Sequence, residues 1–302
     1  MKLITILGPT ATGKTKLAAH IAFKIGGEII SADSRQVFKK MNIGTGKDYG
    51  DYIVKGNTIP AHLIDIFEPG EEFSVFDFQK KFIDAFNIII QKGCIPILCG
   101  GTGLYIESVL KKYRLVDVPE NKKLRNKYSN YSETELIQIL SDLKKLHNIT
   151  DTINKERLLR AIEIEYFYKE NLTTHCLLPE FESYVFGIKY ERTIVMERIT
   201  KRLKERLESG MIEEVQSLIN SGISTEKLKA YGLEYRYITQ YLEKIIDYNE
   251  MFNLLNIAIH QFSKRQMTWF RRMEKNGIEI NWIEGTLTDE EKINIITEKI
   301  NI

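Results

Sequence analysis

The chain opens with an apolar run, Leu3-Ile4-Thr5-Ile6-Leu7, that leads directly into Gly8-Pro9-Thr10-Ala11-Thr12-Gly13-Lys14-Thr15. The first five residues have the size and composition of a buried parallel strand. The next eight fit the pattern G-x-x-x-x-G-K-[ST] of a phosphate-binding loop, or P-loop, and apolar side chains at helical spacing follow it. Glycines allow the tight wrap, and backbone N–H groups at the start of a helix stabilise a diphosphate. The stretch predicts a phosphate-bearing ligand of the kind that nucleotide-binding and ATP-binding proteins hold.

The P-loop also predicts a cofactor. Lys14 adds a positive charge beside the phosphates, and the Thr15 hydroxyl can ligate Mg²⁺, which we therefore expect as a cofactor.

Other parts of a nucleotide hydrolase are missing from the sequence. The apolar run at 95–99 ends in Gly100-Gly101, without an Asp that could help hold Mg²⁺. The guanine-reading element Asn-Lys-x-Asp is missing too. The sequence therefore argues against an ordinary ATPase or GTPase.

Alternating strands and helices define the expected fold. Strands are predicted at 3–7, 28–32, 95–99 and 184–188, with a weaker candidate at Ile64-Asp65-Ile66. Helices are predicted at 14–24, 76–92, 192–209, 212–221, 233–243 and 250–276. This alternation predicts an α/β protein with a parallel sheet flanked by helices.

The middle of the chain differs in character. From 113 to 183 strand signals vanish and Lys, Asn, Glu and Leu dominate, which predicts a helical insertion domain. The remaining residues, 1–112 and 184–302, would form the P-loop core with its C-terminal helices.

Bulk properties narrow the class of protein. The chain has 302 residues, and its net charge of +2 neither favours nor excludes a nucleic-acid partner, so the local distribution of charge matters more. Cys94, Cys99 and Cys176 form no metal-ligand pattern and indicate free thiols in the cytoplasm. No window approaches the roughly 18 apolar residues of a membrane helix, so no membrane partner is expected.

The residues after the second strand are the next site candidates. Asp33-Ser34-Arg35-Gln36 follow a predicted strand end, which is where ligands bind in open α/β sheets. Asp33 can accept a proton, and Arg35 and Gln36 offer paired hydrogen bonds to a base edge or a phosphate. Taken alone, Asp33 fits a cap or an ion-pair partner better than a catalytic base.

Several separated motifs resemble those of the tRNA dimethylallyltransferases, also called tRNA isopentenyltransferases. The motifs follow one another in the same order as in that family. The family's P-loop form and its Asp-Ser-Arg-Gln-Val-Tyr are similar to residues 8–15 and 33–38. Its Met-x-Ile-Gly-Thr matches 41–45, its Pro-His-His-Leu-Ile-Asp resembles 60–65, and its Gly-Gly-Thr-Gly-Leu-Tyr is unchanged at 100–105.

Two further motifs extend the resemblance toward the C-terminus. Residues 157–163 are similar to the family's Arg-x-x-Arg-Ala-Leu-Glu, and residues 264–271 carry its C-terminal signature. No zinc-finger Cys/His set follows the core, which is typical of the bacterial form. The chain departs from the family pattern at Gly46-Lys47-Asp48, where Ala-Lys-Pro is usual, and at Lys155-Glu156 before the insertion motif.

The resemblance implies a reaction. The donor would be dimethylallyl diphosphate, and the acceptor N6 of an adenine just 3′ of a tRNA anticodon. Lys14 and an arginine would stabilise the leaving diphosphate, Asp33 would accept the amine proton, and Thr102 would hydrogen-bond the diphosphate or the acceptor phosphate. The arginine is expected to be Arg202, four residues from Arg198 on one helix face, although two solvated arginines fit the sequence equally well.

The implied partner is the anticodon stem-loop of tRNA. The reacting base must leave its stack, with Arg35 and Gln36 gripping the flipped adenine. The residues expected to contact tRNA are Asp33, Ser34, Arg35, Gln36, Thr102, Arg157, Arg160, Lys264, Arg265, Gln266 and Arg271. In the C-terminal segment we expect apolar side chains such as Trp269 to face the core and the cations to face outward.

Other functions remain open at this point. The same fold could prenylate free adenine nucleotides, although the helical insertion and the basic C-terminal helix favour a macromolecular acceptor. A non-catalytic RNA-binding protein could keep the P-loop as a relic, but the intact Lys14, Thr15, Asp33 and Thr102 argue against decay. A nucleotide kinase is a more distant alternative. We expect a monomer.

Overall fold

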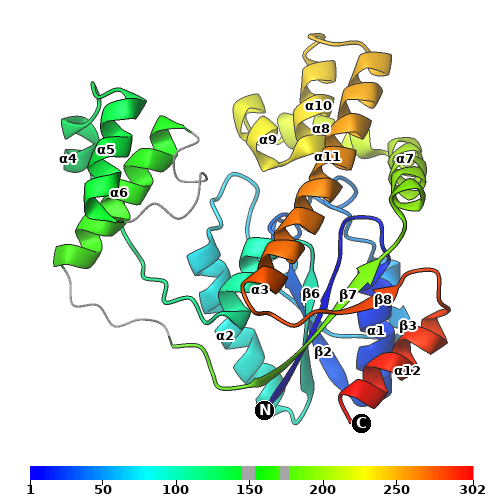
Figure 1. The fold of residues 1–302 in the computed structure, drawn as a ribbon. Helices are drawn as coiled ribbons and strands as arrows, with labels where there is room; N and C mark the ends of the chain where they lie inside the picture. Colours follow the sequence, from blue (N-terminus) through cyan, green and yellow to red (C-terminus); the bar gives the residue numbers. More distant parts are fainter. Residues whose placement is uncertain (145–153, 171–176, 302) are drawn as a thin grey trace. The chain divides into compact units, whose positions relative to one another are not determined.

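The computed structural model describes residues 1–144, 154–170 and 177–301. Six parallel strands form one sheet in the order β5-β2-β6-β1-β7-β8 (Figure 1). These strands are β1 (Lys2–Leu7), β2 (Gly27–Ala32), β5 (Ala61–His62), β6 (Ile95–Gly100), β7 (Glu182–Lys189) and β8 (Asn281–Glu284). A short antiparallel hairpin joins β3 (Ile53–Val54) to β4 (Asn57–Thr58), after a 3₁₀ turn at Tyr49–Tyr52. The predicted fold class, a parallel sheet flanked by helices, is confirmed.

Helices cover both faces of the sheet because its strands alternate their apolar side chains. In β1, Leu3 and Leu7 pack toward α2 (Val75–Gln91) and α3 (Gly103–Leu110), with Phe82 among their neighbours. Ile4 and Ile6 pack on the other face, toward α1 (Lys14–Ile25) and α12 (Asp289–Lys299). This period of two is the pattern of a strand buried on both faces.

A second group of helices lies beyond the carboxyl ends of the strands (Figure 1). It consists of α7 (Arg192–Glu208), α8 (Met211–Asn220), α9 (Thr225–Tyr231), α10 (Leu233–Leu242) and α11 (Tyr248–Lys275). Their shared core includes Leu203, Val215, Tyr235 and Leu255, and it extends to Ala11 of the P-loop. These helices therefore close over the strand ends where a ligand would bind.

The strand ends bring three loops together. In the sheet register Gly100 is paired with both Leu7 and Ala32, so β1, β2 and β6 end at the same level. A Cβ on Gly100 would lie 2.2 Å from the carbonyl oxygen of Ala32, so only glycine fits there. The P-loop, the loop after Ala32 and the loop after Gly100 consequently meet at one edge of the sheet.

The structure corrects several element predictions. The strand expected at residues 64–66 is instead the two-residue β5 at Ala61–His62, because the chain turns through positive φ at Leu63 (64°) and Asp65 (55°). The predictions also lacked α3, α9, β8 and α12. The strand β8 has four residues and is defined by its pairing with β7 rather than by a pattern of its own.

The insertion forms a compact unit of its own, Arg114–Leu177. Its described helices are α4 (Lys122–Lys127), α5 (Glu133–Leu143) and α6 (Lys155–Glu170). This range is narrower than the predicted 113–183, since Tyr113 and residues 178–183 belong to the other unit, Met1–Tyr113 and Leu178–Ile302. Cys176 lies outside the described residues.

The insertion unit has a small core and one buried ionic network. Leu136, Leu140, Leu158 and Ile162 form the centre of that core. The buried Glu163 accepts two hydrogen bonds from Arg125, at 2.7 and 3.1 Å, and others from Arg160 Nη1 and from the backbone of Asn121. Across the described parts of both units, no helix is long and apolar enough to span a membrane.

Candidate active site

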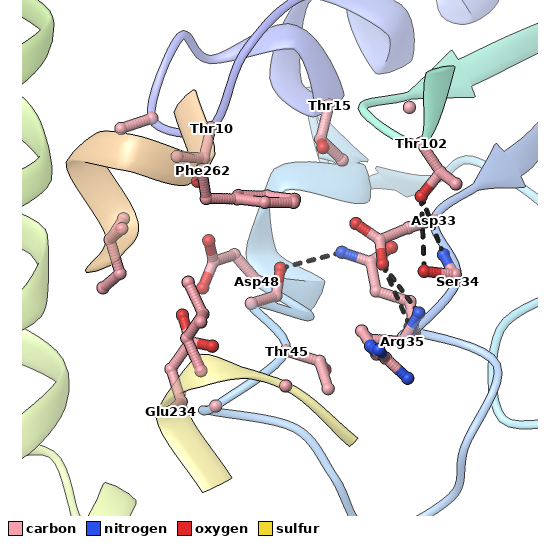
Figure 2. A pocket seen from close by; sticks show the side chains of 18 of the residues that line it. Thr10, Thr15, Asp33, Ser34, Arg35, Thr45, Asp48, Thr102, Glu234 and Phe262 are labelled. Atoms are coloured by element: carbon pink, nitrogen blue, oxygen red, sulfur yellow. Dashed lines mark hydrogen bonds between the residues drawn. The ribbon is translucent and has the colours of Figure 1, made fainter. Parts of the chain in front are cut away.

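One cavity of about 320 Å³ lies where the three loops meet (Figure 2). Its walls come from the P-loop, from the loops after β2 and β6, from the 44–52 segment, and from α7, α10 and α11. The four side chains predicted to be catalytic, Lys14, Asp33, Thr102 and Arg202, all line it. These residues are far apart in sequence, so the fold alone brings them together.

The P-loop wraps as its sequence predicts. Gly13 has φ 77° immediately before α1 begins at Lys14, a left-handed conformation that glycine adopts without strain. The Lys14 ammonium donates to the carbonyl of Pro9 at 3.2 Å, and burial lowers the pKa of Lys14. Thr10, Ala11, Gly13 and Thr15 also face the cavity. A buried cation beside backbone N–H groups suits a diphosphate.

Gln266 of α11 holds the P-loop in place. Its Oε1 accepts a hydrogen bond from Thr10 N at 2.9 Å, and its Nε2 donates to Gly101 O at 2.9 Å. The residue is only 7% exposed because it shares the inward stripe of α11 with residues such as Phe270. Gln266 was predicted to contact tRNA; in this structure both ends of its amide bind protein groups and position the phosphate site.

The loop after β2 is built around Asp33. Its Oδ1 accepts hydrogen bonds from the backbone N–H groups of Arg35 (2.8 Å) and Gln36 (3.4 Å), and Oδ2 receives none from any described residue. The amide of Gln36 is 9% exposed; it accepts from Ser31 Oγ and donates to Gly46 O, both at 3.1 Å. Arg35 and Gln36 were both expected to grip adenine. Among the described residues, the Arg35 side chain has no hydrogen-bond partner, so it is the one of the two that is available to a ligand. Burial lowers the pKa of Arg35.

Thr102 links the loop after β6 to the loop after β2. Its Oγ1 accepts a hydrogen bond from Ser34 N at 3.1 Å and lies 3.5 Å from Ser34 Oγ. Gly103 begins α3 under Trp269, so closely that a Cβ would lie 2.3 Å from the indole ring. The Gly-Gly-Thr-Gly motif therefore serves close packing at both ends and places one hydroxyl in the cavity.

The two arginines expected near the diphosphate have different surroundings. Arg202 lines the cavity, and burial, with Arg206 nearby, lowers the pKa of Arg202 to about 10. Arg198 does not line this cavity; its Nε donates to Ala11 O at 2.8 Å, and its guanidinium lies 4.9 Å from the centre of the Tyr190 ring. Arg202 is therefore placed to meet a ligand, whereas Arg198 supports the P-loop from outside.

Among the side chains that line the cavity and that sequence reasoning missed are Asp48, Arg206, Glu234 and Phe262. Figure 2 shows Glu234 and Phe262 on one side, with Asp33 and Arg35 on the other. Burial raises the pKa of Glu234, and Phe262 remains 40% exposed although it is a large apolar residue. Arg206 could have been found from its i+4 spacing to Arg202 on α7; the other three have no local signal.

The cations of α11 divide between surface and structure. Lys264, Arg265 and Arg271 are exposed, and Arg265 also lines the cavity. Arg272 instead donates to the buried Glu107 at 2.6 Å and stacks 3.9 Å above the Trp269 ring. The expected division, with apolar side chains inward and cations outward, holds except for Arg272.

The two insertion arginines also differ. Arg160 donates to Val118 O at 2.7 Å and lies 3.3 Å from Glu163, so its guanidinium is part of that unit's own network. Arg157 is exposed on α6. Their expected contacts with tRNA stay predictions.

Comparisons with known proteins identify the family. Residues 36–273 match the family model described as IPP transferase, and residues 1–59 match the one described as isopentenyl transferase. A Phocaeicola vulgatus protein named tRNA dimethylallyltransferase 2 is 52% identical over 294 residues, covering 97% of this chain and 96% of the relative. A Bacteroides fragilis protein of the same name is 51% identical over 298 residues, covering 99% and 97% of the two chains.

Solved structures agree with these sequence matches. The full-length tRNA isopentenylpyrophosphate transferase of Bacillus halodurans has a TM-score of 0.71 and 32% identity, covering 99% of this chain and 95% of that one. A eukaryotic dimethylallyltransferase acting on tRNA has a TM-score of 0.78 at 20% identity, covering 99% and 79%, which shows likeness of fold alone. The chain belongs to the IPP transferase family, and the resemblance found in its motifs is confirmed.

Proposed function

We propose that this enzyme transfers the dimethylallyl group of dimethylallyl diphosphate to N6 of the adenine 3′ of the anticodon in tRNA, giving N6-dimethylallyladenosine. The observation that carries the proposal is that one cavity joins a diphosphate-binding wall, with Lys14 and Arg202, to a wall with Asp33 and Thr102. The relatives and the Bacillus halodurans structure support transfer to tRNA. We further propose that the protein acts as a monomer in the cytoplasm.

The first half of the mechanism concerns the leaving group. As the bond between the allylic carbon and the diphosphate oxygen breaks, negative charge develops on the diphosphate. Backbone N–H groups of the P-loop, Lys14 and Arg202 would stabilise this charge, and the presence of both side chains in the lining of one cavity supports that role. Thr102, in the same cavity, orients the diphosphate or the acceptor.

The second half concerns the adenine. N6 attacks the allylic carbon and then loses a proton, which the carboxylate of Asp33 accepts on Oδ2. Oδ1 is already bound to two backbone N–H groups, so the carboxylate keeps one orientation. Arg35 lies beside it and can contact the flipped base. The products are the prenylated adenine and free diphosphate.

Magnesium fits the residues at the P-loop end of the cavity. The Thr15 hydroxyl lines that end, and no group of three or more His, Cys, Asp or Glu side chains suited to a metal occurs among the residues described. Mg²⁺ keeps waters and phosphate oxygens as most of its ligands, so a single protein hydroxyl is an adequate anchor. When bound, Mg²⁺ would neutralise part of the diphosphate charge.

The decisive experiment compares acceptors. The protein is mixed with labelled dimethylallyl diphosphate, Mg²⁺ and either bulk tRNA or AMP, with Lys14→Ala as the inactive control. We expect label in tRNA and none in AMP. Label in AMP alone would establish the free-nucleotide enzyme instead, and label in neither would remove the proposed activity.

Nucleotide turnover provides an independent check. The strand β6 ends in Cys99-Gly100, and Cys99, whose pKa burial raises to about 12, faces the cavity at that end. Without a carboxylate there we expect negligible release of phosphate from ATP or GTP, with or without tRNA. RNA-stimulated hydrolysis would contradict the assignment of the P-loop to a prenyl donor.

A further inference from the structure

Two guanidinium groups lie side by side at one end of the cavity. Arg202 and Arg206 are one helical turn apart on α7, and both line the cavity. A Cβ built on Gly46 would lie 2.4 Å from an Nη of each arginine, which shows how closely both groups pack on that glycine. Like charges held together in a largely enclosed place are unfavourable unless an anion joins them.

In this structure one carboxylate pairs with both arginines. Asp48 accepts hydrogen bonds from Arg206 Nη2 at 3.1 and 3.3 Å and lies 3.8 Å from Arg202 Nη2. Asp48 is 53% exposed, whereas the side chains of Arg202 and Arg206 are 31% and 14% exposed. An ion pair with one exposed partner is weak and is readily exchanged for a stronger anion.

One hydrogen-bond donor of the arginine pair is left without a partner. Arg202 Nε is buried and has no hydrogen-bond partner among the described residues. Two other acids, Asp51 and Glu234, also line the cavity, and burial raises the pKa of both. Lys14 is a third basic side chain in the lining of the same cavity. A ligand with two or more negative charges would satisfy these groups.

The sequence departures from the family pattern fall at this place. The chain has Gly46 and Asp48 where Ala and Pro are usual, and these are the two residues that contact the arginine pair. A side chain at Gly46 would displace Arg202 or Arg206, and proline at position 48 could not pair with either. Gly46, Asp48 and Arg206 thus form one local arrangement.

We propose that Arg202 and Arg206 together bind the diphosphate of the donor, and that Asp48 is a counter-ion that holds the two guanidinium groups until the diphosphate displaces it. The inference rests on the proposed function for the identity of the donor, but the anion site itself does not depend on prenyl transfer. Arg206 then contacts the diphosphate of the substrate directly, and the Asp48 carboxylate competes with the diphosphate for the arginine pair.

The test measures binding of inorganic pyrophosphate with Mg²⁺ to the full chain by calorimetry. Arg206→Met should lower the affinity about 10- to 100-fold, because one charged donor to the ligand is lost. Arg206→Lys should recover part of it, since an ammonium keeps the charge but not the bidentate fork. Lys204→Met, on the outer face of the same helix, is the matched control and should bind as wild type.

Asp48→Asn distinguishes a competing counter-ion from a structural one. If the carboxylate competes with the ligand, its removal should tighten pyrophosphate binding about three- to tenfold and lower the KM for dimethylallyl diphosphate, with the KM for tRNA unchanged. Weaker binding in Asp48→Asn, or wild-type affinity in Arg206→Met, would overturn the inference. A thermal midpoint lowered in Arg206→Met without a change in affinity would assign that arginine to stability alone.

The two proposals fail in different ways. If wild type binds pyrophosphate with these variant effects but labels no tRNA, the arginine pair stands as an anion site and the proposed function falls. If wild type labels tRNA while Arg206→Met keeps wild-type affinity and KM, the proposed function stands and only the pair is rejected.

Discussion

Asp33 uses one carboxylate oxygen to hold its own loop and presents the other to the cavity. An amide at this position keeps the holding oxygen, so Asp33→Asn should preserve the loop, the fold and tRNA binding. It cannot accept the proton from N6, so turnover at saturating substrates should fall roughly 10²–10⁴-fold. Turnover is measured with labelled donor, beside tRNA affinity and the thermal midpoint. Near-normal turnover would show that another group or solvent takes the proton.

Helix α11 has an inward face that supports the P-loop and an outward face that carries exposed cations. Its inward stripe carries Gln266, which joins Thr10 of the P-loop to Gly101 after β6. Gln266→Leu keeps the volume of the side chain but leaves these buried backbone groups unpaired, which should lower the free energy of unfolding by about 1–3 kcal/mol. It should also weaken pyrophosphate binding, because the P-loop loses its support. Chemical denaturation and calorimetry measure the two effects, and a variant with wild-type values in both would show that the bridge is dispensable.

The outward face of α11 belongs to the proposed tRNA interface. Lys264 and Arg271 are exposed and seven residues apart, so they share one face of the helix. If each contacts a tRNA phosphate, neutralising both should weaken tRNA binding and reduce the slope of log affinity against log salt by roughly one to two units. Turnover at saturating tRNA should change little. Binding constants at several salt concentrations decide the matter, and an unchanged slope would remove this face from the interface.

At the scale of the whole molecule, the two compact units should respond to different changes. Glu163 is buried in the insertion unit, and although burial would raise its pKa, hydrogen bonds from Arg125 and from the backbone of Asn121 outweigh burial and lower it. Glu163→Gln breaks the ion pair between Glu163 and Arg125 and should destabilise the insertion unit by roughly 2–4 kcal/mol. Hydrogen exchange should accelerate in residues 114–144 and 154–170 but not in the P-loop core.

The Glu163 carboxylate also makes the stability of the insertion unit depend on pH. Because its folded-state pKa lies below the ordinary value of 4.5, its stabilisation is present above that pH and is lost as the pH falls through the folded-state value. Protection factors in the wild-type insertion, which compare the observed exchange rate with the intrinsic rate at each pH, should therefore fall in acid, and Glu163→Gln should show a flatter dependence. Pyrophosphate affinity at neutral pH serves as the control, because it should be equal in both proteins. Loss of pyrophosphate binding in Glu163→Gln would contradict the independence of the units.

The sequence by itself determined the features that depend on neighbouring residues. The strand, loop and helix at residues 2–25 follow from a local pattern of apolar spacing and glycine, and Asp33 was identified because it follows a strand end. Apolar side chains near the C-terminus were likewise expected to face the core, and Phe270 of α11 is fully buried. Such features are encoded over one or two turns of chain, where periodicity and turn chemistry act directly.

Only the tertiary structure decided the contacts between distant segments. Gln266 reaches the P-loop across 256 positions, and Arg206 meets Asp48 across 158. Nothing in the local sequence of Asp48 marks it as a partner of α7, and β8 exists as a strand because β7 offers it an edge. These features depend on where the folded sheet and helices place side chains in space, which the spacing of residues along the chain does not specify.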